Sequence, residues 1–197
     1  MEVSLYKFLK AYNNDLKTSN NKYYGRAIGE TYNVISKTFS KESIEPIDDY
    51  IRTVDTSGFR KISFDFLQTL KTIASSKYYD PLNQIQYLKT RINIGKELLN
   101  GRKKLDVVLQ CGIDISKNNL MILAFSSNYN LDLEASMLKG LLIEFPTEDK
   151  LFIDVKRIDR LTCWELSKGE ENVIDFSIVQ PTSRNLLIKT ANRLTCP

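Results

Sequence analysis

The sequence predicts an α+β fold in which a helical region comes first and a mostly antiparallel sheet follows. Apolar residues recur at helical spacing up to about residue 104, and beyond it short apolar runs are separated by turn residues. The charge changes at the same place. Residues 1–104 hold 18 basic against 11 acidic residues, a net charge of +7, and residues 105–197 hold 10 against 13, a net charge of −3. We therefore expect one domain (1–197) with two subregions, one helical and basic, the other β-rich and mildly acidic.

About five helices are expected before residue 104. The first is predicted from Leu5, Phe8, Leu9 and Tyr12, which recur at i, i+3, i+4 and i+7 and so share one helix face. Further apolar stripes at this spacing predict helices over residues 28–39, 47–54, 59–73 and 82–92. Pro46 suits the first position of the third helix, and turn residues 56–58 and 100–101 end the third and the fifth.

Three hairpins are expected after residue 104. The first pairs residues 105–115 with 120–125, the second pairs 140–145 with 151–158, and the third pairs 162–166 with 173–179. A short helix is predicted over 131–139 and an edge strand over 186–190. Because strands do not alternate with helices, a parallel doubly wound sheet is not expected. Trp164, on the third hairpin, is expected to anchor a core or an interface.

Several function classes are excluded by what the chain lacks. Without histidine there is no imidazole to act as a general base or to bind a metal ion. The eight glycines form neither a Rossmann nor a P-loop pattern, and no apolar run is long enough to span a bilayer. Three distant cysteines, Cys111, Cys163 and Cys196, indicate reduced thiols and an intracellular location, cytoplasmic or nuclear. We expect a binding protein rather than an enzyme, with no cofactor and no metal ion.

The basic, tyrosine-rich half supplies the leading candidate site. Lysine and arginine neutralise phosphates, and aromatic rings stack on exposed bases, so the two together are typical of single-stranded nucleic-acid surfaces. The candidate residues lie in three segments: Lys22, Tyr23, Tyr24 and Arg26; Lys77, Tyr78 and Tyr79; Arg102, Lys103 and Lys104. The leading hypothesis is a non-enzymatic binding or assembly protein that contacts nucleic acid, nucleoprotein or another anionic partner. The open alternative is that the tyrosines pack between helices while the lysines face solvent.

A second hypothesis is a divalent-metal-dependent nuclease. Asp154 and Lys156 share one face of a predicted strand, and the candidate carboxylates on other predicted strands are Glu144, Asp106 and Asp114. This set is similar to the PD-(D/E)XK nucleases, in which two carboxylates bind Mg²⁺ and a lysine positions the attacking water. It departs from them because residues 120–125 lack the expected glutamate.

A third hypothesis is a protein–protein adaptor, which would need a large apolar surface near Trp164 or the first helix. The expected partner is nucleic acid or nucleoprotein, and a protein partner or self-association is the open alternative. The abundance of Asn, Lys and Ile is typical of AT-rich coding genomes, such as those of many viruses and phages.

Overall fold

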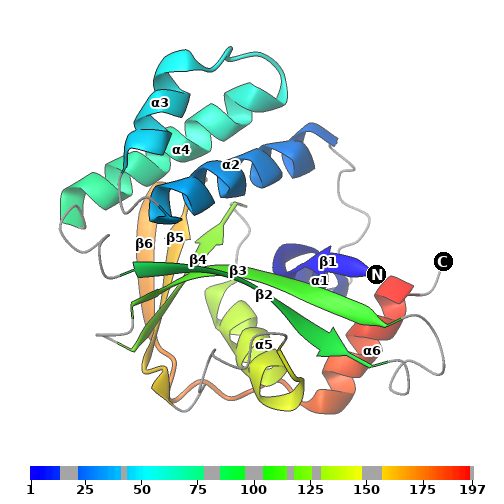
Figure 1. The fold of residues 1–197 in the computed structure, drawn as a ribbon. Coiled ribbons are helices and arrows are strands. Elements are labelled where there is room, and N and C mark those ends of the chain that lie inside the picture. The colour runs from blue at the N-terminus through cyan, green and yellow to red at the C-terminus, as the bar shows by residue number, and fades with distance from the viewer. Residues whose placement is uncertain are drawn as a thin grey trace.

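The computed structural model describes residues 1–13, 22–40, 44–77, 85–95, 104–114, 118–125, 130–147 and 157–195. These residues form six helices and a six-stranded, mostly antiparallel sheet, which confirms the predicted α+β class (Figure 1). The helices are α1 (Leu5–Tyr12), α2 (Lys22–Ser40), α3 (Glu45–Thr53), α4 (Phe59–Lys77), α5 (Leu131–Glu144) and α6 (Arg184–Thr195). The strands are β1 (Glu2–Ser4), β2 (Ile85–Ile94), β3 (Leu105–Asp114), β4 (Asn119–Ala124), β5 (Arg160–Glu165) and β6 (Glu170–Asp175). No helix among them is long and apolar enough to cross a bilayer.

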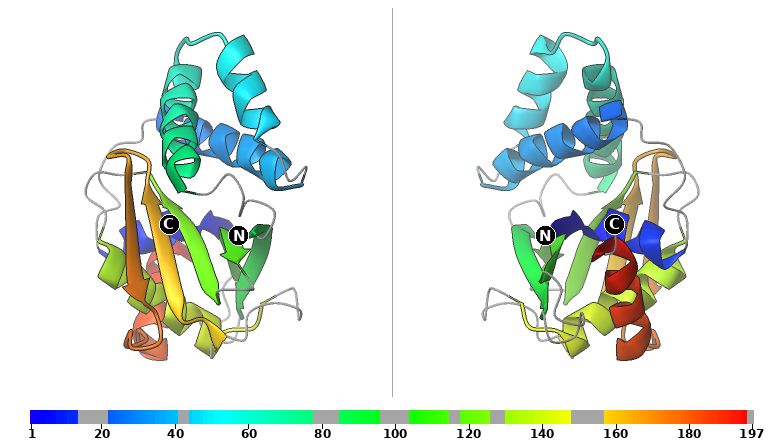
Figure 2. Two further views of the ribbon diagram at one scale, coloured as in Figure 1. Left: turned by 90° about the vertical axis from the view of Figure 1, so that its left-hand side faces the viewer. Right: turned by 90° about the vertical axis from the view of Figure 1, so that its right-hand side faces the viewer.

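Strand β3 organises the sheet because it has neighbours on both edges. Antiparallel β2 pairs with it along its whole length on one edge. On the other edge, β1 pairs in parallel with residues 106–108, and β4 pairs antiparallel with residues 112–114. Beyond residue 121, β4 turns away from β3 and continues its pairing with β5, which in turn pairs with β6. The sheet therefore splits, and Figure 2 shows its two parts diverging toward α2–α4.

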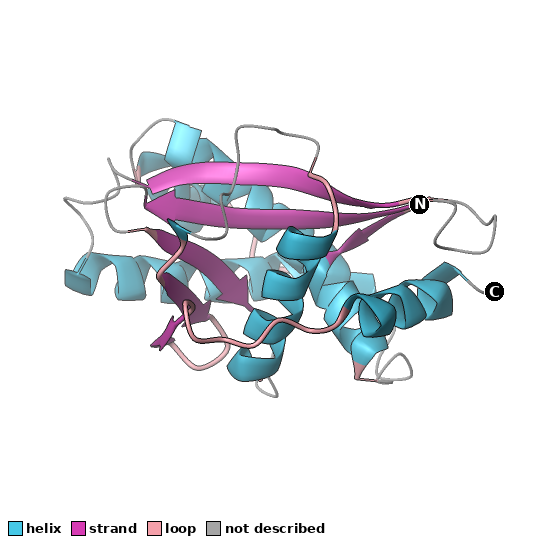
Figure 3. Cartoon of the chain, turned by 90° about the horizontal axis from the view of Figure 1, so that it is seen from below, coloured by secondary structure: helices cyan, strands magenta, loops and turns pink. Residues whose placement is uncertain are grey.

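Helices cover both faces of the sheet and enclose two apolar clusters. Along β4, residues 120, 122 and 124 belong to the larger cluster, whereas residues 121, 123 and 125 belong to the smaller one. This alternation follows from the two-residue period of a strand. Helices α1, α5 and α6 pack on the larger cluster, on the face seen from below in Figure 3, and α2, α3 and α4 pack on the smaller one.

The first four predicted helices are confirmed within the described residues. Ser4 caps α1 by accepting a hydrogen bond from the Lys7 backbone N–H at 3.2 Å, as a serine at this position is expected to do. Pro46 lies in the first turn of α3. Gly58, with φ of +53°, supplies the left-handed backbone of the turn before α4.

The fifth predicted helix, over residues 82–92, is wrong for the part described, because residues 85–94 form β2. Side chains at 90, 92 and 94 are buried, while Lys89 is exposed and Arg91 and Asn93 are half-buried. The ten-residue pairing with β3 outweighed the helical spacing of the apolar residues. Strand β1 was not predicted, since three residues are too few to show a pattern.

The hairpin predictions are confirmed in two cases and wrong in one. β3 and β4 are joined through Asn118, whose φ is +49°, and β5 and β6 through Gly169, whose φ is +74°. Residues 140–145 were expected to form a strand, but α5 continues through them to Glu144. Most of the intended partner strand, residues 151–156, lies outside the described residues.

The predicted edge strand over residues 186–190 is also wrong, because these residues belong to α6. Leu187 and Ala191, one helical turn apart, are fully buried in the larger cluster. The spacing of four residues that buries them together is helical and not strand-like.

Candidate functional site

The described parts of the first two basic segments lie far apart in the structure. Tyr23, Tyr24 and Arg26 lie in the first turns of α2, and Lys104 directly precedes β3. Figure 1 places the first turn of α2 and the last turn of α4, which ends at Lys77, at opposite ends of the helical layer. The side chains of Lys22 and Lys77, and the whole of Tyr78, Tyr79, Arg102 and Lys103, lie outside the described part of the chain.

The two adjacent tyrosines of α2 differ in role. The Tyr24 ring packs edge-on against Phe66, with 5.8 Å between ring centroids, and its hydroxyl donates to the carbonyl oxygen of Phe125. Burial raises the pKa of Tyr24 to about 12, because desolvation disfavours the phenolate. Tyr24 is therefore a packing residue, as the alternative interpretation expected. Tyr23 is 57% exposed and its ring lies against Gly58.

Two arginines contact one aromatic ring at the beginning of α4. The guanidinium carbon of Arg26 lies 4.3 Å from the centroid of the Phe59 ring, and that of Arg60 lies 5.8 Å from it. Such cation–π contacts hold the planar guanidinium groups in place. Both arginine side chains are exposed, and neither forms an ion pair with a described carboxylate.

Three other basic side chains of the helical layer pair with acidic neighbours. Arg52 pairs with Asp49, Lys61 pairs with Asp65 at 2.7 Å, and Lys71 pairs with Asp48 at 2.6 Å. Arg26 and Arg60 thus retain a free positive charge that these three residues lack.

The backbone adds positive potential at the same place. The N-termini of α2 and α4 lie on the same side of the helical layer (Figure 1), and neither helix has an acidic residue in its first turn. Helices α3 and α5, in contrast, both carry two acidic residues there. Free N–H groups and the macrodipole make an uncompensated helix N-terminus attractive to anions. The nearby Asp55 carboxylate accepts a hydrogen bond from the Ser57 hydroxyl at 2.9 Å.

We call Tyr23, Arg26, Phe59 and Arg60 the amino-end surface. Two of these four residues were in the sequence-predicted set. Phe59 and Arg60 were missed because they lie more than 30 positions along the chain and reach Arg26 only through the packing of α4 on α2. A signal was present, since Phe59-Arg60-Lys61 directly follows a predicted turn.

The carboxylates proposed for a nuclease do not converge where they are described. Asp106 and Asp114 lie at the two ends of β3, eight residues and roughly 27 Å apart along the strand. Glu144 ends α5 and lies 3.8 Å from the Arg184 guanidinium. Asp154 and Lys156 lie outside the described residues. Within the described ranges, no three acidic or cysteine side chains form a group that could bind a metal ion.

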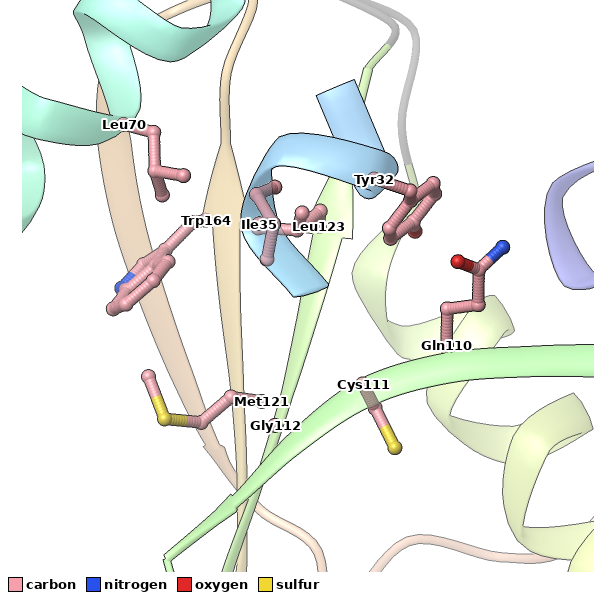
Figure 4. Close-up of a pocket in the computed structure, with 9 residues that line it drawn as sticks. All are labelled: Tyr32, Ile35, Leu70, Gln110, Cys111, Gly112, Met121, Leu123 and Trp164. Carbon is pink, nitrogen blue, oxygen red and sulfur yellow. The ribbon is translucent and has the colours of Figure 1, made fainter. Parts of the chain in front are cut away.

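A small cavity lies where β3 and β4 part, beneath the helical layer (Figure 4). Its volume of about 20 Å³ admits one water molecule and no larger ligand. It is lined by Tyr32, Ile35, Leu70, Gln110, Cys111, Gly112, Met121, Leu123 and Trp164. Burial raises the pKa of the Cys111 thiol, so this cysteine remains protonated and unreactive. The cavity is a packing defect at the split of the sheet.

Neither position suggested for an adaptor surface is exposed. Trp164 is only 3% exposed, and its indole Nε1–H donates to the Glu171 carboxylate at 3.0 Å, so it is the core anchor that was predicted. Leu5, Phe8 and Leu9 of α1 are buried in the larger cluster. No protein-family model, no curated protein and no solved structure matches the chain.

Proposed function

We propose that the protein binds single-stranded nucleic acid through the amino-end surface. The observation that carries the proposal is the pair of guanidinium groups, on Arg26 and Arg60, that contact the Phe59 ring and form no ion pair with a described carboxylate. The exposed Tyr23 ring lies against Gly58, the residue before Phe59. Guanidinium groups donate in pairs to phosphate oxygens, and an exposed tyrosine ring stacks on a base without selecting its identity.

Single strands are favoured over a duplex because their bases are free to stack. In a duplex the base faces are covered by neighbouring base pairs, and only phosphates and base edges are accessible. The Tyr23 ring would then have no base to stack on, and binding would depend on Arg26 and Arg60 alone. The N-termini of α2 and α4 support phosphate binding in both cases.

The test is fluorescence anisotropy with labelled 20-nucleotide single strands of DNA and RNA, and with a duplex, over a series of salt concentrations. The plot of log K against log salt concentration has a negative slope. For the Arg26→Ala/Arg60→Ala variant we expect this slope to become shallower by about 1.4, since each of two lost phosphate contacts to a single strand contributes about 0.7. Tyr23→Ala should weaken binding roughly 5- to 150-fold, the range measured for loss of one stacked base, with little change in the salt slope.

Lys37→Ala is the matched control, because it removes one exposed positive charge from the other end of α2. It should leave affinity and salt slope unchanged. An equal loss for Lys37→Ala and the double arginine variant would refute the assignment, as would tighter binding to the duplex. Parallel samples with Mg²⁺ score cleavage, and cleavage that survives loss of the amino-end surface would favour the nuclease hypothesis instead.

A further inference from the structure

Arg26 has an acidic neighbour on its own helix with which it forms no ion pair. Glu30 follows Arg26 by four positions in α2, a spacing that places two helical side chains on one face with their Cβ atoms about 5–6 Å apart. Neither residue forms an ion pair with the other or with another described charge. The Arg26 guanidinium lies instead against the Phe59 ring, with 4.3 Å between its central carbon and the ring centroid.

The same spacing does produce an ion pair on α4. Lys61 and Asp65 are also a basic residue and an acidic residue four positions later, and their charged atoms lie 2.7 Å apart. Lys61 contacts a ring as well, but this contact is longer, with 5.3 Å from its Nζ to the Phe64 centroid, and the ion pair is intact. What distinguishes Arg26 is the close contact with Phe59.

The packing of α4 on α2 sets the position of the Phe59 ring. Ser63 of α4 is fully buried, and its hydroxyl lies 3.1 Å from the carbonyl oxygen of Ala27 and 3.3 Å from that of Phe59. Ala27 is the residue after Arg26. One hydroxyl therefore ties together the backbone at the two places whose side chains meet.

Glu30 also lies close to the second arginine of the amino-end surface. Burial is the largest cause of the raised pKa of Tyr50, and among nearby charges the Glu30 carboxylate raises this pKa while the Arg60 guanidinium lowers it. Both charges therefore lie near the Tyr50 hydroxyl. A carboxylate in this position competes with a phosphate for the Arg26 guanidinium, because both anions accept paired hydrogen bonds from it.

We infer that Phe59 is a positioning residue whose ring holds the Arg26 guanidinium away from Glu30 and keeps it available to a phosphate group. Without the ring, Arg26 would pair with Glu30, and a phosphate would have to displace that carboxylate. The functional consequence rests on the proposed binding of single strands, whereas the position of Arg26 can be measured in the protein alone.

Nuclear magnetic resonance of the ¹⁵N-labelled protein without nucleic acid measures this position. The ring current of Phe59 should shift the Nε–H proton signal of wild-type Arg26 upfield, and Phe59→Leu should remove the shift while keeping an apolar side chain. Glu30→Gln should then displace the Arg26 signal more in the Phe59→Leu background than in the wild type, because only there do the two residues pair.

Two results would overturn the inference at this stage. One is a wild-type Arg26 signal without the upfield shift, a measurement that needs no variant. The other is an equal response of the Arg26 signal to Glu30→Gln in the two backgrounds.

The anisotropy assay with a labelled 20-nucleotide single strand measures the consequence for binding. Phe59→Leu should weaken binding roughly 3- to 30-fold, since an i,i+4 ion pair must be broken and a flexible arginine must be ordered. Adding Glu30→Gln should recover roughly 1.4- to 2.3-fold in affinity, the value of the ion pair alone. Unchanged affinity of Phe59→Leu beside a wild type that binds would overturn the role of Phe59. A wild type that binds no single strand would instead refute the proposed function, and the Arg26 signals would still decide whether Phe59 holds the guanidinium.

Phe64→Leu is the matched control, because it makes the same change to another half-buried ring of α4. Phe64 contacts Lys61, which is already paired with Asp65, so its loss releases no unpaired cation. The variant should leave both the Arg26 signal and the affinity unchanged. An equal loss of affinity in Phe64→Leu and Phe59→Leu would overturn the inference, since it would assign the effect to the helical layer as a whole.

Discussion

Replacing Gly140 by alanine should destabilise the protein, although the same change inside most helices stabilises it. Alanine in a helix interior is favoured over glycine by about 0.5–1 kcal/mol. Gly140 lies inside α5, but a Cβ built on it would lie 2.5 Å from the Thr182 carbonyl oxygen and 3.2 Å from Leu187 Cδ1. The opposing atom at the shorter distance belongs to the backbone and cannot rotate away.

The size of the stability loss in Gly140→Ala follows from how far the segment at Thr182 must move. Ordinary contact begins at 3.4 Å, so the segment at Thr182 must retreat by roughly 0.9 Å, the amount by which the 2.5 Å contact falls short. This segment is tied to α5 by the Thr182 N–H, which donates to the Ser136 carbonyl at 2.9 Å, and by the Ser136 hydroxyl, which donates to the Gln180 carbonyl at 2.7 Å. Weakening bonds worth about 1 kcal/mol each, together with overpacking at Leu187, gives a net loss of roughly 1–3 kcal/mol.

Urea denaturation followed by the fluorescence of Trp164, the sole tryptophan, measures this loss. For a chain of 197 residues the melting temperature should fall by roughly 3–10 °C. Gly29→Ala in α2 is the matched control, because nothing lies within 4 Å of its added Cβ, and it should stabilise by about 0.5–1 kcal/mol. If Gly140→Ala stabilises the protein as Gly29→Ala does, the backbone at Thr182 does not oppose a Cβ at position 140.

Three further predictions concern buried groups. The folded-state pKa of Tyr24 is about 12 and that of an unfolded tyrosine is near 10, so the unfolded chain loses its proton first and stability should fall as pH rises between these values. Urea titrations at successive pH values measure how steeply the free energy of unfolding falls with pH, and Tyr24→Phe should make this fall less steep. The fall should not disappear, because burial also raises the pKa of Tyr50. An unchanged fall would contradict the raised pKa of Tyr24. Thr90→Val should raise the unfolding free energy by about 1 kcal/mol, because the buried Thr90 hydroxyl has no hydrogen-bond partner, and any clear loss would indicate an unseen partner. Leu138→Ala should cost about 2–5 kcal/mol in chemical denaturation, since Leu138 is fully buried in the larger cluster, and a cost below about 1 kcal/mol would argue against that packing.

The parts of the fold that the sequence predicts well are those decided by local chemistry. Pro46 and Gly58 mark helix boundaries through a fixed φ and a left-handed turn, and both act as expected. Asn118 likewise marks the β3–β4 turn. Each of these signals involves only a few neighbouring residues, so it can be read without knowing the tertiary structure.

The errors occur where distant pairing decides the structure. The apolar residues of 85–94 fit both a helical and an alternating pattern. Because β3 pairs with all ten residues, the alternating pattern determines the structure and the segment forms a strand. Residues 140–145 are an apolar run whose type cannot be read from spacing, and α5 extends through them because Gly140 permits close packing on Thr182. The site shows the same division: composition identified Tyr23 and Arg26, but Phe59 and Arg60 join them only through helix packing.

The pairing of the first elements with the last has a consequence for synthesis on the ribosome. Arg193 of α6 donates to the carbonyl oxygen of Ala11 at the end of α1, across 182 positions of chain. At a synthesis rate of about 5–20 residues per second, Arg193 is added on the order of 10–40 s after Ala11, so the contact cannot form earlier. The helices α2 to α4 pack mainly on one another and emerge early, whereas Phe8 and Leu9 must wait for α5 and α6 to complete their cluster. During that interval the apolar face of α1 lacks the neighbours that α5 and α6 later provide.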